Sequence, residues 1–365
     1  MSTDLKVRKL NLVDLLLEEN DDVEEPPEYA IDLWSEEHIR QYFENGGLLR
    51  GLPVPTDDFT PSPASAGDKN QNGVHLKDES QLKREYPAVP EDEFHKWFPD
   101  QHSNISKTKC ATPKMRLICF TNAGNEENVF TLEGLRAKRV ETLLEWCRSH
   151  AIEVLAVQLP GRGKRRKEPF MQTIQQVAKE VLRVVGSKLV DVPYCVIGHS
   201  LGTWEAFEFL SRAREEGFAM PLQSFLSAFP APNIPEQDRP WKQCRHMTGP
   251  EFMDEARGWD VNEVVFQPSM WELYSPMMRA DFMLFDEYEF RRASDAPFDF
   301  PLTSFVGLAD KRVKELMVQG WGKMTSQAFE CNRIAGNHLW VMEKEPKIQW
   351  YQIIISHLKK LPLFN

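Results

Sequence analysis

The residues most able to do chemistry lie in the pentapeptide Gly198-His199-Ser200-Leu201-Gly202. A short apolar run before it, Tyr194 to Ile197, predicts a buried strand, and the amphipathic pattern that follows Gly202 predicts a helix. Glycines on both sides of the serine permit a sharp turn from strand to helix, which exposes the serine hydroxyl at the helix N-terminus. We interpret Ser200 as an activated nucleophile. An ordinary turn between a strand and a helix is the alternative.

A serine hydroxyl is a weak nucleophile at neutral pH and needs a base, together with a third group that orients the base. Asp310 follows the apolar run Leu302 to Gly307, and His338 comes after a further helix and a short strand. The order serine, acid, histidine with both partners at strand ends is that of one class of hydrolases. We therefore expect Ser200, Asp310 and His338 to form a catalytic triad.

Two other titratable residues compete for these roles. Asp281 is an alternative acid, but it falls inside a helical pattern rather than at a strand end. His199 is adjacent to Ser200, so its side chain is expected to point away from the nucleophile, and we interpret it as structural.

Attack by serine on a carbonyl creates an oxyanion that needs N–H donors. The residue after the nucleophile, Leu201, supplies the first N–H, and the loop after the strand Met115 to Phe120 supplies the second. We assign the second donor to Ala123, with Asn122 as the alternative.

Apolar strands alternate with helices from Met115 onward. Strands are predicted over 115–120, 152–159, 194–197, 224–229 and 302–307, and helices up to Trp146, over 174–185, after Gly202 and over 313–328. This alternation predicts an α/β fold with a mostly parallel central sheet and helices on both faces. The segment of about 236–297 is rich in Met, Phe and Trp without strand alternation, and we interpret it as a helical lid insertion.

Apolar lid residues have two possible uses, to line a channel for an acyl chain or to make ordinary core contacts. These residues are Phe252, Met253, Trp271, Met277, Met278, Phe282 and Met283.

The charge of −11 is unevenly distributed. Residues 1–92 carry 21 acidic and 9 basic side chains, which leaves a net charge of +1 for residues 93–365. This balance argues against nucleic-acid binding and is compatible with an acidic partner. We find no apolar run long enough for a membrane span and no secretory signal, and the six cysteines are scattered without metal-type spacing. We expect a cytoplasmic protein with no metal and no cofactor.

Residues 1–92 are predicted to be an acidic extension with two short helices and a flexible linker, and residues 93–365 the catalytic domain. The first helix would present Leu5, Leu10, Leu12, Val13, Leu16 and Leu17. The second would begin at Ser35 as N-cap and end at Gly46-Gly47. The composition from Gly51 to about Ala88 is typical of a linker. The extension either docks a partner or is a tail that stays disordered or packs on the catalytic domain.

From about His95 onward the chain resembles the stand-alone type II thioesterases of polyketide, nonribosomal-peptide and fatty-acid synthesis, which have the α/β-hydrolase fold. The resemblance rests on several motifs in order. They are Phe120-x-x-Ala123-Gly124, Gln158-Leu159-Pro160-Gly161-Arg162 with Arg165 and Glu168-Pro169, the elbow around Ser200, Ser227 with Ala231-Pro232, Arg279-Ala280-Asp281-Phe282 with Tyr288, Gly307-x-x-Asp310 and Gly336-x-His338.

The resemblance implies a serine thioesterase that hydrolyses acyl thioesters on the phosphopantetheine arm of an acyl carrier protein or on coenzyme A. It would release or edit chains for a synthase complex, as a monomer. A general carboxylesterase or lipase and a non-catalytic binding module are the alternatives. This chain departs from the family pattern at three positions, where Asn125, Ala228 and Asn337 stand in place of the family's glycines.

The basic run Arg162 to Lys167 has two interpretations. Its charges either meet the phosphate of a phosphopantetheine arm or an acidic carrier protein, or brace loops through pairs such as one with Glu168. We favour bracing by Arg162 and Arg165.

Overall fold

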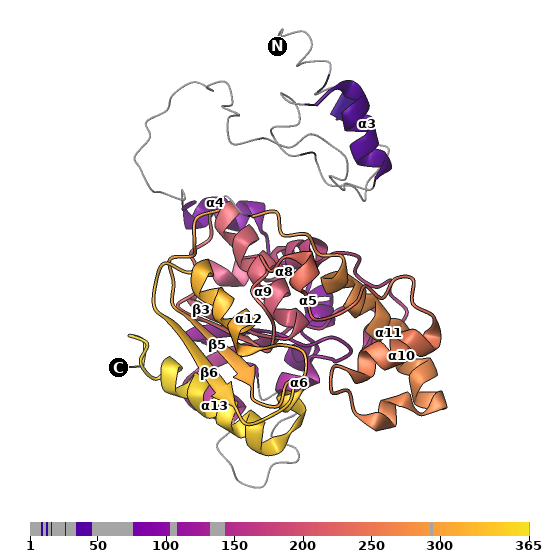
Figure 1. Ribbon diagram of the computed structural model, residues 1–365. Coiled ribbons are helices and arrows are strands. Elements are labelled where there is room, and N and C mark those ends of the chain that lie inside the picture. Colours follow the sequence, from indigo (N-terminus) through magenta and orange to yellow (C-terminus); the bar gives the residue numbers. More distant parts are fainter. Residues whose placement is uncertain are drawn as a thin grey trace. The chain divides into compact units, whose positions relative to one another are not determined.

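The computed structural model describes residues 76–102, 108–131, 143–292 and 295–364, together with residues 34–45 and five single positions near the N-terminus, Lys9, Leu12, Val13, Leu16 and Pro26. Strands and helices alternate through this part of the chain (Figure 1). The strands are β1 (Met115–Phe120), β2 (Ile152–Ala156), β3 (Tyr194–His199), β4 (Ser224–Ser227), β5 (Leu302–Gly307) and β6 (Phe329–Ile334). The helices are α3 (Glu36–Glu44), α4 (Glu79–Glu85), α5 (Glu91–Trp97), α6 (Asn128–Thr131), α7 (Leu143–Ser149), α8 (Ile174–Leu189), α9 (Leu201–Glu215), α10 (Gly249–Arg257), α11 (Pro268–Asp286), α12 (Glu315–Gln319) and α13 (Lys344–Leu358).

The six strands form one sheet in the order β2-β1-β3-β4-β5-β6, and every neighbouring pair is parallel. The register aligns Phe120 with Gly198, and Gly307 with Ile334. All carboxyl ends therefore meet at one edge of the sheet, where open α/β sheets bind their ligands. The parallel sheet of the sequence prediction is confirmed.

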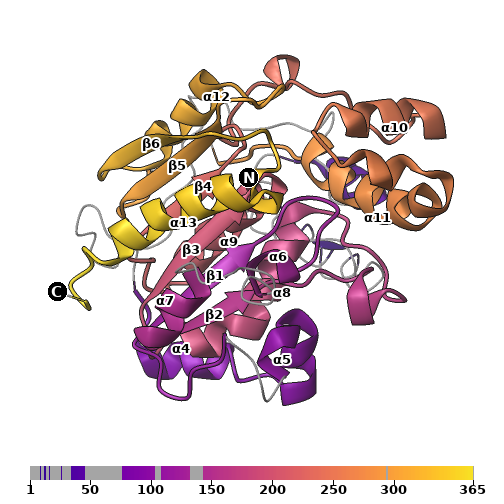
Figure 2. The ribbon, with the colours of Figure 1, turned by 90° about the horizontal axis from the view of Figure 1, so that it is seen from below.

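Alternate residues of each strand enter two separate cores. Ile118 and Phe120 of β1 pack with helices α8 and α9, whereas Leu117 and Cys119 pack with α7 and α13. Figure 2 shows α13 and α7 on one side of the strands, with α8 and α9 behind them. Burial on both faces explains why β1 to β5 are rich in apolar residues, whereas the edge strand β6 is only partly buried.

The predicted lid lies between β4 and β5 and contains α10 and α11, which project together at one end of the sheet (Figure 1). Its side chains Phe252, Met278 and Phe282 are buried and belong to the same core as α9. Core packing thus accounts for these three side chains, and the acyl channel stays a prediction.

Three predicted elements are shorter than expected. The strand expected over 152–159 ends at Ala156. The helix expected over 313–328 is reduced to α12 and a 3-10 turn at Gly320–Met324. Two glycines in that turn disfavour a continuous helix. Buried Trp321 in the same turn donates its indole N–H to the Phe229 carbonyl at 2.9 Å. The strand expected over 224–229 ends at Ser227, because Ala228 adopts the left-handed φ of 61°.

The contacts divide the chain into two compact units, residues 1–73 and residues 74–365. Helix α4 belongs to the second unit: Asp78 caps it by accepting from the Gln81 N–H at 2.9 Å, and Leu82 is buried in the core. Tyr86 packs so closely over Gly186 of α8 that a Cβ there would lie 2.9 Å from the ring. The boundary near residue 92 and the linker over 76–88 are therefore corrected, and residues 51–75 lie outside the described residues.

In the first unit, α3 begins as predicted. Ser35 is its N-cap and accepts from the His38 N–H at 3.2 Å. The predicted stop at Gly46-Gly47 lies outside the described residues. The described residues contain no helix long and apolar enough to cross a membrane.

Candidate active site

Ser200 occupies the turn between β3 and α9 with φ 54° and ψ −127°, a backbone conformation that residues other than glycine rarely adopt. A Cβ at Gly198 would lie 2.5 Å from the Gly202 carbonyl oxygen, and a Cβ at Gly202 would lie 2.4 Å from that of Phe120. Only glycine fits at either position, because the turn is tight and the end of β1 presses against the first turn of α9. The sharp turn predicted from the sequence is confirmed, whereas the predicted exposure of the serine is wrong, because Ser200 is only 4% exposed.

The structure brings the three predicted triad residues together. Ser200 Oγ lies 2.8 Å from His338 Nε2, and His338 Nδ1 lies 2.8 Å from Asp310 Oδ2. All three side chains are buried, with relative exposures of 4%, 1% and 5%. The other oxygen of Asp310 accepts from the N–H groups of Arg312 and Val313, each at 2.9 Å. A carboxylate only accepts, so His338 Nδ1–H donates to Asp310, and neutral Nε2 accepts the Ser200 hydroxyl proton.

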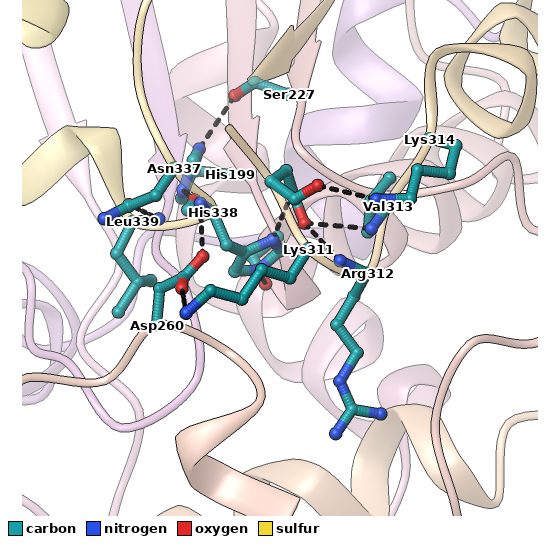
Figure 3. Close-up of polar contacts among 12 residues, drawn as sticks. His199, Ser227, Asp260, Lys311, Arg312, Val313, Lys314, Asn337, His338 and Leu339 are labelled. Carbon is teal, nitrogen blue, oxygen red and sulfur yellow. Dashed lines mark hydrogen bonds and ion pairs between the residues drawn. The ribbon is translucent and has the colours of Figure 1, made fainter. Parts of the chain in front are cut away.

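His199 contacts the backbone of His338 and points away from the Ser200 side chain, as expected of a structural residue. Its Nε2 lies 3.0 Å from the His338 carbonyl oxygen and its Nδ1 lies 3.1 Å from Ser227 Oγ (Figure 3). Nε2–H must donate to that carbonyl, so Nδ1 is an acceptor, and it shares the single Ser227 hydroxyl proton with the Gly198 carbonyl, which lies 2.9 Å from Ser227 Oγ. Burial and the neighbouring His338 hold the pKa of His199 well below its ordinary value, so it stays neutral and keeps this tautomer.

The two predicted oxyanion donors come from neighbouring parts of the sheet edge. Leu201 is the first residue of α9, so its N–H lies where a helix has no partner of its own and where its dipole favours negative charge. The contact between Gly202 and Phe120 brings the loop of Ala123 next to this helix end. The next N–H of that loop, Gly124, already donates to Asp281 Oδ2 at 2.7 Å and is not available for this role; Ala123, with Asn122 as the alternative, stays a prediction.

Asp281 of lid helix α11, the alternative acid of the sequence analysis, is instead paired with Arg162 of the loop that follows β2. The Arg162 guanidinium donates to both carboxylate oxygens and to the Asn125 carbonyl, and the two paired side chains are each 3% exposed. Arg162 therefore ties lid helix α11 to the oxyanion loop.

The second arginine of the basic run also braces a loop. Arg165 pairs with Glu168 at 2.7 Å and donates to the Gln158 carbonyl at 2.8 Å. The bracing role of both arginines is confirmed, although the partner of Arg162 is Asp281 rather than Glu168.

The three departures from the family pattern have local explanations. Ala228 takes the left-handed backbone that a glycine would adopt. Asn125 donates its N–H to the Asn122 carbonyl at 3.3 Å, and Asn337 Oδ1 accepts from the Leu339 N–H at 2.7 Å. The Asn337 side chain thus stabilises the turn that carries His338, whereas the Asn125 bond is a backbone contact that a glycine would also make.

Sequence reasoning missed the contacts of the lid with this site. Trp259 packs its ring edge to face with His338 at 4.7 Å between centroids, and Asp260 accepts from the His338 N–H. No local pattern signals them, because both lie in a turn between helices. Among the described residues, no group of three His, Cys, Asp or Glu side chains is arranged to hold a metal ion.

Comparisons with known proteins agree with this geometry. The chain is 29% identical over 278 residues to the gramicidin S biosynthesis protein GrsT of Aneurinibacillus migulanus, covering 74% of this chain and 96% of that protein. It is 26% identical over 237 residues to the medium-chain S-acyl fatty acid synthase thioesterase of Rattus norvegicus, covering 63% and 82%. The solved structure of the type II thioesterase BorB from the borrelidin biosynthetic cluster has a TM-score of 0.58 at 24% identity, covering 69% and 96%.

BorB supports the fold predicted from the sequence, that of the α/β-hydrolases. The family model of the thioesterase domain matches residues 143–360, which include Ser200, Asp310 and His338. This match spans more than half of the chain, so the protein belongs to the thioesterase domain family.

Proposed function

We propose that this protein is a type II serine thioesterase, which hydrolyses acyl thioesters on the phosphopantetheine arm of a carrier protein or on coenzyme A. The observation that carries the proposal is the pair of 2.8 Å contacts that joins Ser200 to His338 and His338 to Asp310. GrsT is a gramicidin S biosynthesis protein, and the rat relative is a fatty acid synthase thioesterase; both names favour a synthase as the partner.

In the first half of the reaction, His338 Nε2 takes the proton of Ser200 as the hydroxyl oxygen attacks the thioester carbonyl carbon. The negative charge on the former carbonyl oxygen is met by the N–H groups of Leu201 and Ala123. The carbon–sulfur bond then breaks, His338 gives its proton to the leaving thiolate, and the acyl group remains on Ser200 as an ester.

In the second half, His338 takes a proton from water as the water oxygen attacks the acyl ester. The same two N–H groups meet the second oxyanion, and His338 returns the proton to Ser200 as the carboxylic acid leaves. Asp310 holds the imidazole in the required tautomer and stabilises its positive charge in both halves. Every proton is accounted for by these three side chains, the thiol and water.

We propose a synthase as the source of the substrate. Residues 1–73 belong to a separate compact unit. A carboxylesterase with this triad would prefer oxygen esters, and a non-catalytic binding module would not need the triad.

The test is hydrolysis of acyl-coenzyme A and acyl-carrier thioesters by the wild type and by Ser200→Ala, with mass spectrometry of the intact protein. We expect turnover that vanishes in the variant and a transient acyl adduct on Ser200 in the wild type. Faster turnover of simple esters than of any thioester would favour the carboxylesterase. No turnover by a folded wild type would favour the binding module.

A further inference from the structure

Asp260 occupies the lid turn between α10 and the next 3-10 turn, Glu263–Phe266, with a left-handed φ of 60°. Aspartate is one of the few residues other than glycine that tolerate this backbone. The turn aims its carboxylate out of the lid and toward the loop that carries His338 (Figure 3).

The carboxylate of Asp260 bridges the backbone of His338 and the side chain of Lys311, the residue that follows Asp310. Its Oδ2 accepts from the backbone N–H of His338 at 3.2 Å, and its Oδ1 lies 2.7 Å from Lys311 Nζ. The Asp260 side chain is 6% exposed, whereas that of Lys311 is 70% exposed. The buried partner of the ion pair is therefore the one that contacts the histidine loop.

Further lid contacts surround this bridge. Arg312 pairs with Glu255 of α10 at 2.8 Å and donates to the Pro240 carbonyl at 2.6 Å. A Cβ at Gly258 would lie 2.2 Å from the Arg312 guanidinium, so the lid turn sits directly on the loop that carries Asp310. Together with the contact of Trp259 on the His338 ring, one lid turn touches both loops that supply triad partners.

Backbone support for His338 comes from two directions. The His338 carbonyl accepts from buried His199, which belongs to the sheet, and its N–H donates to Asp260, which belongs to the lid. The backbone of His338 sets the position of its imidazole ring. A displacement of about 1 Å at a reacting group can lower a rate by about 100-fold.

We propose that Asp260 is a positioning residue of the thioesterase reaction: it fixes the backbone of His338 from the lid, so that Nε2 stays aligned with Ser200. The inference rests on the proposed function for its kinetic readout, and its spectroscopic readout is independent of any substrate.

Two substitutions separate the hydrogen bond from the fold. Asp260→Gly removes the acceptor and suits the left-handed backbone, so it introduces no steric strain. Asp260→Asn keeps an acceptor oxygen and also tolerates this backbone. Asp254→Asn is the matched control, because Asp254 is an exposed lid carboxylate that pairs with Arg257 on the surface of α10.

The kinetic experiment measures single-turnover acylation of the full chain with an acyl-coenzyme A substrate. We expect Asp260→Gly to lower the acylation rate by about 10- to 100-fold with little change in KM. Asp260→Asn should restore it to within about threefold of the wild type, and Asp254→Asn should match the wild type, as is usual for exposed pairs.

Low-field proton NMR of the resting protein follows the His338 Nδ1–H that donates to Asp310. We expect this resonance to shift or broaden in Asp260→Gly and to persist in Asp260→Asn. An unchanged rate and an unchanged resonance in the glycine variant would overturn the inference. An inactive wild type would instead overturn the proposed function, while the NMR comparison would still decide the role of Asp260.

Discussion

At the scale of single residues, Asp310 sets the tautomer of His338. Burial alone raises the pKa of a carboxyl group, but the hydrogen bond and charge of His338 and the N–H groups of Val313 and Arg312 outweigh it, so the pKa of Asp310 is lowered. Asp310 therefore stays ionised across the whole neutral and mildly acidic range. Protonation of Asp310 therefore does not limit the activity in this range.

Asp310→Asn tests this role. The new amide donates to His338 Nδ1, which leaves the imidazole proton on Nε2, where it faces Ser200 and blocks proton transfer. We expect kcat for thioester hydrolysis to fall by about 10⁴-fold at pH 7. Circular dichroism melting serves as the folding control. A loss of less than about tenfold in a folded variant would contradict the assigned role.

Glu205 is a buried carboxyl group that the proposed reaction does not use. It lies in the second turn of α9, 2% exposed, and burial and the nearby charge of Asp281 raise its pKa to about 8, although Arg162 acts in the opposite direction. In the unfolded chain a glutamate loses its proton near pH 4.3. Between these values the folded chain binds one proton more, so the free energy of unfolding falls as the pH rises.

Glu205→Gln removes this titration while keeping the shape of the side chain. At pH 5 both folded chains carry a neutral group at this position, and the variant should be more stable by only about 1 kcal/mol, because Glu205 is already ionised in most of the unfolded wild type. At pH 8 the variant should be more stable by about 2–5 kcal/mol. Urea unfolding at the two pH values measures the difference, and an offset that is independent of pH would contradict the raised pKa of Glu205.

At the scale of elements, strands β1 to β5 were predictable because burial on both faces makes them rich in apolar residues. The order of Ser200, Asp310 and His338 was predictable because parallel strands deliver their ends to one edge. The lid contacts were not, since Asp260 and Asp281 meet their partners through the packing of α10 and α11 on the sheet, which no local pattern encodes. Helix α4 was missed because its neighbourhood has the composition of a linker, and α8 supplies the burial of Leu82.

Asp281 connects the lid helix α11 with the oxyanion loop in two ways, through the buried Arg162 pair and through the Gly124 N–H. Asp281→Ala leaves a buried guanidinium unpaired, so we expect a loss of about 3–5 kcal/mol in the free energy of unfolding. Replacing both partners, as Arg162→Met with Asp281→Leu, should recover most of this loss.

Activity should not recover in the double variant, because the Gly124 N–H still lacks its acceptor and the loop of Ala123 is left less constrained. Unfolding curves and kcat measured on the wild type, Asp281→Ala and the double variant separate the two contributions. Recovery of kcat together with stability would show that Asp281 acts through the ion pair alone.

At the scale of the whole molecule, acidity and structure divide at nearly the same point. Most of the excess negative charge precedes residue 92, and the compact unit that holds the candidate site begins at Val74. Within that unit, Lys77 donates its N–H to the Gly217 carbonyl at 3.1 Å, and Tyr86 packs on Phe218 at 4.9 Å between ring centroids. Residues 76–92 therefore stabilise the catalytic unit itself.

Two truncations test this division. A chain that begins at Val74 should keep the melting temperature of the sheet-containing unit and the kcat/KM for acyl-coenzyme A, because every triad and lid contact is retained. A chain that begins at Glu93 loses α4 and exposes the surface beneath Leu82, which costs about 2–5 kcal/mol, so it should melt at a lower temperature. If the chain that begins at Val74 instead loses only its turnover of carrier-bound thioesters, the acidic unit contributes to carrier recognition. Equal stability of the two truncated chains would contradict the boundary at Val74.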